Sequence, residues 1–276
     1  AFNVNGGDTR FDRQFPSYAF VYPLGLNFSK SRQIYSSNSN ENTYTGLWEG
    51  PHYGFKILIE TFQRTESPIR VKPANIYYHF YSGERHAGLI SLSSAYEYAK
   101  KQDIFGIFTS EYARIANDFY VTKIFPLKGG GYEIRNKGYL KTIRFDNTDL
   151  NIDFNRSKNI LGFRHFQNSL YVSLGEQGPY KIFLTSKIPT KPYVIQASFH
   201  VGNFKHESKK ISFTKQGWAN SRIRLGGLTP KQNYLIQTKH DKIQHSSDKE
   251  GVLSIQFSTS EGTSAPVATT ITPVDK

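Results

Sequence analysis

The residue best placed to do chemistry in this sequence is a histidine at the end of an apolar segment. Residues Asn75–His79 predict a strand entered at Pro73, and its last two residues, Tyr78 and His79, face opposite sides. Barrel enzymes keep reactive groups at the carboxyl ends of their strands, and a histidine that changes charge near neutral pH can act as a general acid. His79 is therefore a candidate catalytic acid, and Tyr78 a candidate substrate contact. A buried histidine that is hydrogen-bonded at a strand end is the alternative.

Two polar segments earlier in the chain could bind a ligand. In the first, a Gly-Gly pair follows a strand-like segment and aims Asp8 and Arg10 into the same space. In the second, amides, hydroxyls and one carboxylate precede a run of aromatic residues, as a site for sugar hydroxyls requires. Its candidate residues are Asn40, Glu41, Tyr44 and Trp48. The alternatives are an ordinary glycine turn with a surface ion pair and a polar surface loop.

The elements that would position these residues alternate between short apolar strands and amphipathic helices, a pattern typical of a parallel sheet or a barrel. The periodicity predicts helices over residues 53–65 and 84–101. It also predicts a buried strand over 103–108 and a short helix over 109–118. This pattern ends near residue 127.

The rest of the chain reads as an all-β region. A turn cluster at Lys128–Gly131 is followed by many short segments with period-two alternation, which favours an antiparallel sandwich. The segment Leu228–Tyr234 resembles the tyrosine corner of fibronectin-type sandwiches. From residue 260 onward the Ser, Thr, Pro and Ala content is typical of a mobile tail. We therefore expect three parts: an α/β region over 1–127, a β-sandwich over 128–259 and a tail over 260–276.

Composition excludes several classes of site and protein. The 276 residues contain no cysteine, so disulfides, thiolate metal sites and cysteine nucleophiles are excluded. No segment approaches the roughly 20 apolar residues of a membrane span. The chain has no methionine and opens at Ala1 in a strand-like segment, so we expect it to be part of a larger protein.

The formal net charge of +13 belongs almost entirely to the second half of the chain. Residues 1–127 carry 13 basic and 11 acidic side chains, whereas residues 128–276 carry 22 and 11. Such an excess predicts an acidic protein or membrane neighbour, but dispersed charges without a Lys/Arg run disfavour nucleic acid. The histidines of this half lack the spacing of metal ligands, and we assign no metal site there.

The order of motifs in residues 1–145 resembles the C-terminal half of a NodB-type polysaccharide deacetylase domain, and within that family the Pel-type exopolysaccharide-modifying proteins. The motifs are Asn5–Thr9, Ser37–Thr45 with Trp48, Pro51–Phe55, Ile76–His79 and Ser110–Ala113.

The resemblance implies a distorted (β/α) barrel that removes N-acetyl groups from an amino-sugar exopolysaccharide, in the periplasm or outside the cell. In that family a divalent metal, commonly zinc, polarises the acetyl carbonyl and its water. A histidine on the last motif strand acts as acid toward the leaving amine, and this role carries over to His79. Asp8, Arg10, Asn40 and Glu41 carry over as residues that line the site. A β-sandwich behind the barrel is also expected.

The chain departs from the family pattern at the metal site. The Asp-Asp motif and the paired metal-binding histidines belong to the first barrel strands, and nothing like them occurs in this sequence. We therefore expect that this chain alone binds no metal and has no deacetylase activity. The missing half of the barrel or a partner chain would cover the open edge of its sheet.

Two other functions fit the same residues. In a non-catalytic carbohydrate-binding protein, aromatic side chains would stack on sugar rings. A glycoside hydrolase could use Asp8 and Glu41 if they lay about 5–10 Å apart across a cleft.

Overall fold

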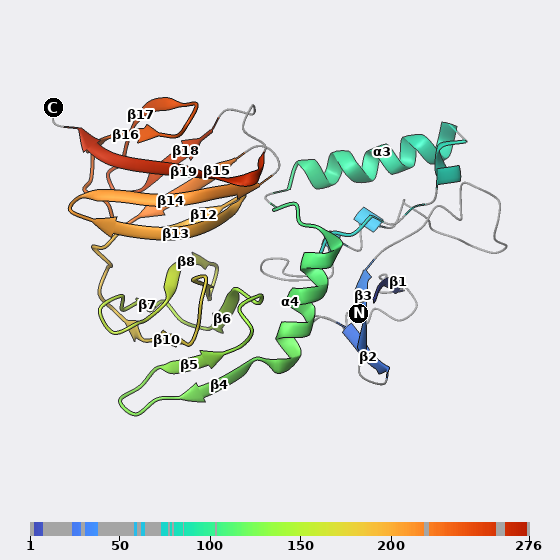
Figure 1. The fold of residues 1–276 in the computed structure, drawn as a ribbon, viewed down its shortest axis with the longest axis horizontal. Helices are drawn as coiled ribbons and strands as arrows, with labels where there is room; N and C mark the ends of the chain where they lie inside the picture. Colours follow the sequence, from blue (N-terminus) through green and yellow to red (C-terminus); the bar gives the residue numbers. More distant parts are fainter. Residues whose placement is uncertain are drawn as a thin grey trace. The chain divides into compact units, whose positions relative to one another are not determined.

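The chain forms two compact units, which the computed structural model divides between Tyr120 and Val121. The structure describes residues 3–7, 24–28, 31–37, 58–59, 62–63, 73–76, 78, 80–84, 86–102, 104–217, 221–257 and 263–274. Unit 1 spans residues 1–120 and unit 2 spans residues 121–276. Figure 1 shows the elements of both.

Unit 1 combines a small sheet with two helices. In the sheet, β3 (Ser31–Ser37) lies between β1 (Asn3–Gly7), to which it is parallel, and β2 (Leu24–Phe28), to which it is antiparallel. A short 3-10 helix, η1 (Phe80–Gly83), precedes the helix α3 (His86–Lys100). The second long helix, α4 (Thr109–Val121), runs up to the boundary with unit 2.

Small residues let the helices of unit 1 pack closely. Leu92 and Ala95 of α3 are buried against Leu58 and Phe62. Ile34 of β3 forms a second cluster with Tyr112 and Ala116 of α4. The start of α4 is fixed where the Phe108 amide donates a hydrogen bond of 2.8 Å to the Glu111 carboxylate, as in a capping box.

The helices predicted over 84–101 and 109–118 are confirmed as α3 and α4. The helix predicted over 53–65 lies mostly outside the described residues, of which 58–59 and 62–63 are helical. The predicted strands of this region are not confirmed. Residues 73–76 and 78 have no regular secondary structure, so the strand expected over Asn75–His79 is not present at its described positions. The predicted buried strand over 103–108 is also wrong, because Ile104–Phe108 is irregular and exposed. An apolar segment becomes a strand only where a neighbouring strand pairs with it. The described residues of unit 1 contain no closed barrel.

Unit 2 is built from strands alone, as the period-two alternation predicts. Its largest sheet has six strands in the order β18-β15-β12-β8-β9-β6. Their bounds are Leu253–Gln256, Arg222–Gly226, Tyr193–Ala197, Ile160–Phe166, Ser169–Leu174 and Thr142–Asp146. Every pairing in this sheet is antiparallel except that of β12 with β8, which are parallel and pair at Val194 and Gly162.

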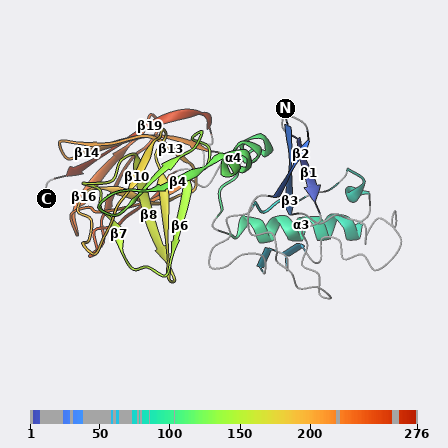
Figure 2. The ribbon, with the colours of Figure 1, turned by 90° about the horizontal axis from the view of Figure 1, so that it is seen from below.

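The second sheet has five strands in the order β13-β14-β19-β16-β17, all antiparallel. Their bounds are His200–Glu207, Lys210–Gly217, Thr263–Val274, Asn233–Gln237 and Lys242–Ser246. This sheet packs on β12, β15 and β18 around a core that includes Ile211, Phe213 and Ile236 (Figures 1 and 2).

The remaining strands cover the other half of the six-stranded sheet. One small sheet has the order β10 (Tyr180–Ile182), β5 (Tyr132–Arg135), β4 (Lys123–Pro126), and another pairs β11 (Leu184–Thr185) with β7 (Asn151–Ile152). They enclose a second core whose members include Ile134, Phe163, Val172 and Tyr180.

The tyrosine corner is confirmed and the mobile tail is wrong. Tyr234 is buried, and its hydroxyl accepts a hydrogen bond of 3.3 Å from the Thr229 amide. Residues 263–274, expected in the tail, form β19 in the middle of the five-stranded sheet. Their alternation of Val267, Thr269 and Ile271 outweighs a composition that is otherwise typical of linkers.

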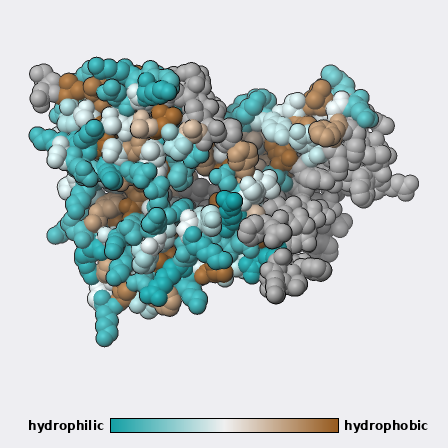
Figure 3. Space-filling model, in the orientation of Figure 1, coloured by the Kyte–Doolittle hydropathy of each residue, from teal (hydrophilic) through white to brown (hydrophobic). Residues whose placement is uncertain are grey.

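The surface of unit 2 is strongly basic. Its residues include 23 Lys and Arg against 11 Asp and Glu, a formal net charge of +12. Hydrophilic side chains cover most of its described surface on the face drawn in Figure 3. No helix within the described residues is long and apolar enough to cross a membrane.

Candidate functional site

Most of the predicted site residues lie outside the described part of the chain. This applies to Asp8, Arg10, Asn40, Glu41, Tyr44, Trp48 and His79. Their predicted roles therefore stay predictions. Tyr78 is the predicted site residue that the structure describes.

Tyr78 packs against the helix α3 rather than standing alone at a strand end. Its ring meets the Tyr96 ring edge-on, with 6.3 Å between centroids, and 41% of Tyr78 is exposed. Burial, and then the neighbouring Tyr78 phenol, raise the pKa of Tyr96 above its ordinary value. The two rings form a half-exposed aromatic surface that carries two phenol hydroxyls.

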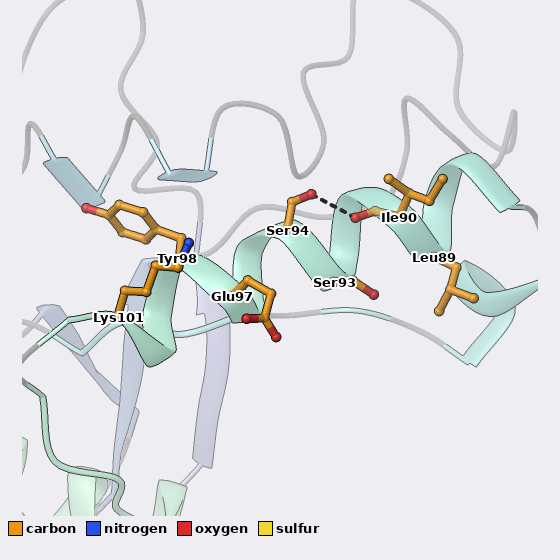
Figure 4. A pocket seen from close by; sticks show the side chains of 7 residues that line it. All are labelled: Leu89, Ile90, Ser93, Ser94, Glu97, Tyr98 and Lys101. Atoms are coloured by element: carbon orange, nitrogen blue, oxygen red, sulfur yellow. Dashed lines mark hydrogen bonds between the residues drawn. The ribbon is translucent and has the colours of Figure 1, made fainter.

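A shallow groove follows the exposed side of α3 (Figure 4). Its lining mixes apolar and polar side chains, and Ser94 satisfies its own hydroxyl by donating to the Ile90 carbonyl at 2.9 Å. The carboxylate of Glu97 is paired with Lys100 at 2.8 Å. The lining residues are Leu89, Ile90, Ser93, Ser94, Glu97, Tyr98 and Lys101. With one carboxylate and no histidine, they offer no acid–base pair.

Unit 2 holds a more specific constellation on the six-stranded sheet. Tyr171 of β9 is paired in register with Arg164 of β8 on one side and with Arg144 of β6 on the other. Paired residues point to the same face of a sheet, so a tyrosine lies between two arginines. We call these three residues the Arg–Tyr–Arg row. They face away from the core that Phe163 and Val172 enter from the same strands.

Both arginines of the row are held in place by neighbours. Arg164 Nη1 donates a hydrogen bond of 2.8 Å to Gln196 Oε1, and the guanidinium lies 5.4 Å from the centre of the Phe166 ring. Arg144 contacts Asp146 through Nε to Oδ1 at 2.9 Å and through Nη2 to Oδ2 at 3.3 Å. These contacts orient each guanidinium on the sheet.

The tyrosine between them carries a buried hydroxyl that makes no well-formed hydrogen bond, although it lies near the Arg144 guanidinium. Tyr171 is 8% exposed, so nine-tenths of it is buried. Burial acts to lower the pKa of Arg144, but Tyr171 and the Asp146 carboxylate act against it, and the pKa is raised above its ordinary value. A buried hydroxyl without a partner costs stability unless a ligand satisfies it. The row therefore places a buried phenol between two guanidinium groups on one face of the sheet.

This row was missed from the sequence alone, although all three of its strands were predicted. The three residues come from separate strands, and only the register of the sheet brings them together. A signal was present in the alternation, which places Arg164 and Tyr171 opposite the apolar residues of their own strands. The pairing of those strands could not be read from one sequence.

The described residues contain no group of three or more histidine, aspartate or glutamate side chains that could hold a metal ion. No protein-family model, curated protein or solved structure matches the chain.

Proposed function

We propose that this chain is a docking and substrate-handling segment of a polysaccharide-modifying enzyme, and that unit 2 binds an acidic protein through the Arg–Tyr–Arg row. The observation that carries the docking role is the register of the sheet, which sets the buried Tyr171 between two oriented arginines on one face. Arginine and tyrosine are the residue types that dominate protein interfaces, whereas lysine is depleted there.

An acidic protein fits this surface better than the polymer that the enzyme would produce. A deacetylated amino-sugar polymer is cationic, and a unit of net charge +12 would repel it. Carboxylates of a partner protein could instead accept from the guanidinium groups of Arg144 and Arg164, which reach the surface on either side of Tyr171. Such charge-assisted hydrogen bonds contribute about 1.5–3 kcal/mol each.

For unit 1 we propose part of a metal-dependent polysaccharide N-deacetylase, with His79 as the general acid. Its support is the motif order in residues 1–145, together with the aromatic surface of Tyr78 and Tyr96. Divalent metal ligands and the rest of the barrel would come from elsewhere. The test is acetate release from an acetylated amino-sugar polymer by the longer protein. Substitution of His79 by alanine should abolish release, and an unchanged rate would contradict the acid role.

The docking role is tested with immobilised poly-L-glutamate as the acidic probe. The double variant Arg144→Gln/Arg164→Gln should bind about tenfold more weakly than the unmodified chain, because it loses charge-assisted hydrogen bonds. The matched control is Lys205→Gln/Lys242→Gln, which removes two exposed charges from the five-stranded sheet. Exposed charges contribute little to binding, so the affinity of the control for poly-L-glutamate should stay within about threefold of that of the unmodified chain. Equal losses in both variants would mean that only net charge matters, and would contradict a specific site.

A further inference from the structure

The strand β19 occupies an unusual place in the five-stranded sheet. It pairs with β14 on one side and with β16 on the other. The sheet therefore consists of two hairpins, β13–β14 and β16–β17, which are joined through β19 alone among the described strands. If β19 left the sheet, β14 and β16 would each present an open edge, and a groove one strand wide would lie between them.

The groove does not depend on β19 for its walls. Both hairpins bury their own apolar residues against the opposite sheet: Val201, Ile211 and Phe213 from one, Tyr234 and Ile236 from the other. These side chains pack with residues of β12, β15 and β18, among them Ile223 and Ile255. The hairpins therefore have an anchor that remains when β19 is absent.

For a central strand, β19 fits its groove poorly. Pro266 and Pro273 lack the N–H group that a central strand donates to its neighbours, and proline is ordinarily confined to edge strands. Thr269 is 1% exposed and points its hydroxyl into the core without a hydrogen-bond partner. Ile271 is the one large apolar side chain of β19 that is fully buried. These features weaken a strand that is otherwise paired on both sides.

From these observations we infer that β19 is exchanged between copies of this chain, the strand of one copy filling the groove of another. The second copy is the occupant that the structure favours, because its β19 carries the same side chains in the same register. Five residues, 258–262, separate Phe257 from β19, and such a connection can span about 20 Å when extended. Reciprocal exchange gives a closed dimer, and exchange in one direction gives a growing chain.

The test uses the absence of native cysteine. Ser212 of β14 and Thr270 of β19 are paired across the ladder and half-exposed, at a separation that a disulfide can bridge. A Ser212→Cys chain and a Thr270→Cys chain are mixed, warmed to just below the unfolding temperature, cooled and oxidised. The expected product is a disulfide between one chain's position 212 and the other chain's position 270, identified by peptide mass spectrometry.

A control pair separates exchange from random collision. Arg224 of β15 and Ser254 of β18 are also paired and exposed, but in the other sheet. Mixed Arg224→Cys and Ser254→Cys chains should give at least about tenfold less of the mixed disulfide. A second variant, Thr269→Val in the Thr270→Cys chain, should slow the exchange about fivefold by removing the unsatisfied hydroxyl. Equal yields of the mixed disulfide from both pairs would overturn the inference. So would the absence of a 212–270 disulfide between chains, if the Ser212→Cys/Thr270→Cys double variant forms this disulfide within one chain.

Discussion

Two buried hydroxyls without a well-formed hydrogen bond belong to the two features of unit 2 to which we assign a role. One belongs to Tyr171 in the Arg–Tyr–Arg row and the other to Thr269 in β19. Buried polar groups are nearly always satisfied, so each exception needs an explanation. In our account the first lies between two arginines that bind carboxylates of a partner, and the second weakens the strand that we infer is exchanged.

Replacing Thr269 by valine should therefore stabilise unit 2. The two side chains have almost the same shape, but valine has no hydroxyl to desolvate, and we expect a gain of about 1 kcal/mol in the free energy of unfolding. Urea unfolding followed by circular dichroism measures it. The control is Thr270→Val on the half-exposed face of the same strand, which should change stability by less than about 0.5 kcal/mol. A loss of stability in Thr269→Val would show that the hydroxyl does have a partner.

Tyr193 should make stability fall in alkaline solution. Its ring stacks on Phe163 with 4.6 Å between centroids, and burial raises its pKa above the ordinary value of 10.0. In the unfolded chain the phenol ionises near pH 10, while in the folded chain it holds its proton to higher pH. The contribution of the neutral Tyr193 phenol to the stability of the fold is thus complete below pH 10, and it is lost as the pH rises through the raised pKa. Unfolding midpoints at about pH 9 and about pH 11 should differ less in Tyr193→Phe than in the unmodified chain. An equal difference between the two midpoints in both chains would contradict a raised pKa of Tyr193.

At the scale of elements, the joint between the two halves of unit 2 is a single parallel pairing of β12 with β8 at Val194 and Gly162. A Cβ atom on Gly162 would lie 1.8 Å from the Val194 carbonyl oxygen, so glycine is required for this close approach of two strands.

The free energy of unfolding of the Gly162→Ala variant should consequently be lower by about 3 kcal/mol or more, because the backbone rather than a flexible side chain must shift. Thermal unfolding of the full chain is the measurement. Gly106→Ala is the matched control, since a Cβ there meets nothing within 4 Å, and it should unfold near the temperature of the unmodified chain. A Gly162→Ala chain that also unfolds near the temperature of the unmodified chain would contradict the importance of this pairing.

Elements with a clear local pattern were predictable from the sequence, and those that depend on pairing were not. The helix α3, the β-rich second half and the tyrosine corner follow from periodicity and from the spacing of Leu228 and Tyr234. The segment Ile104–Phe108 has the apolar content of a strand, but no described strand pairs with it. β19 has the composition of a tail and is a strand because two neighbours offer it an edge. Pairing is a property of the whole sheet, which explains both errors.

At the scale of the whole molecule, charge and chemistry are divided between the units. Unit 1 has a net charge of +1 and contains the residues for which we propose deacetylase chemistry, whereas unit 2 has a net charge of +12. The candidate site of unit 1 was proposed from motif order, and most of its residues lie outside the described part of the chain. The row of unit 2 became visible only in the register of the sheet. The central claim is accordingly that unit 2 recognises acidic groups at one defined place.

Arginine footprinting tests that claim most directly. The full chain is treated with phenylglyoxal, with and without poly-L-glutamate, and the modification of each arginine is measured by mass spectrometry. Arg144 and Arg164 should be protected by the acidic probe, while Arg222 and Arg224, which are exposed on β15, should react at an unchanged rate. Equal protection of all four arginines, or protection of Arg222 and Arg224 alone, would contradict the account.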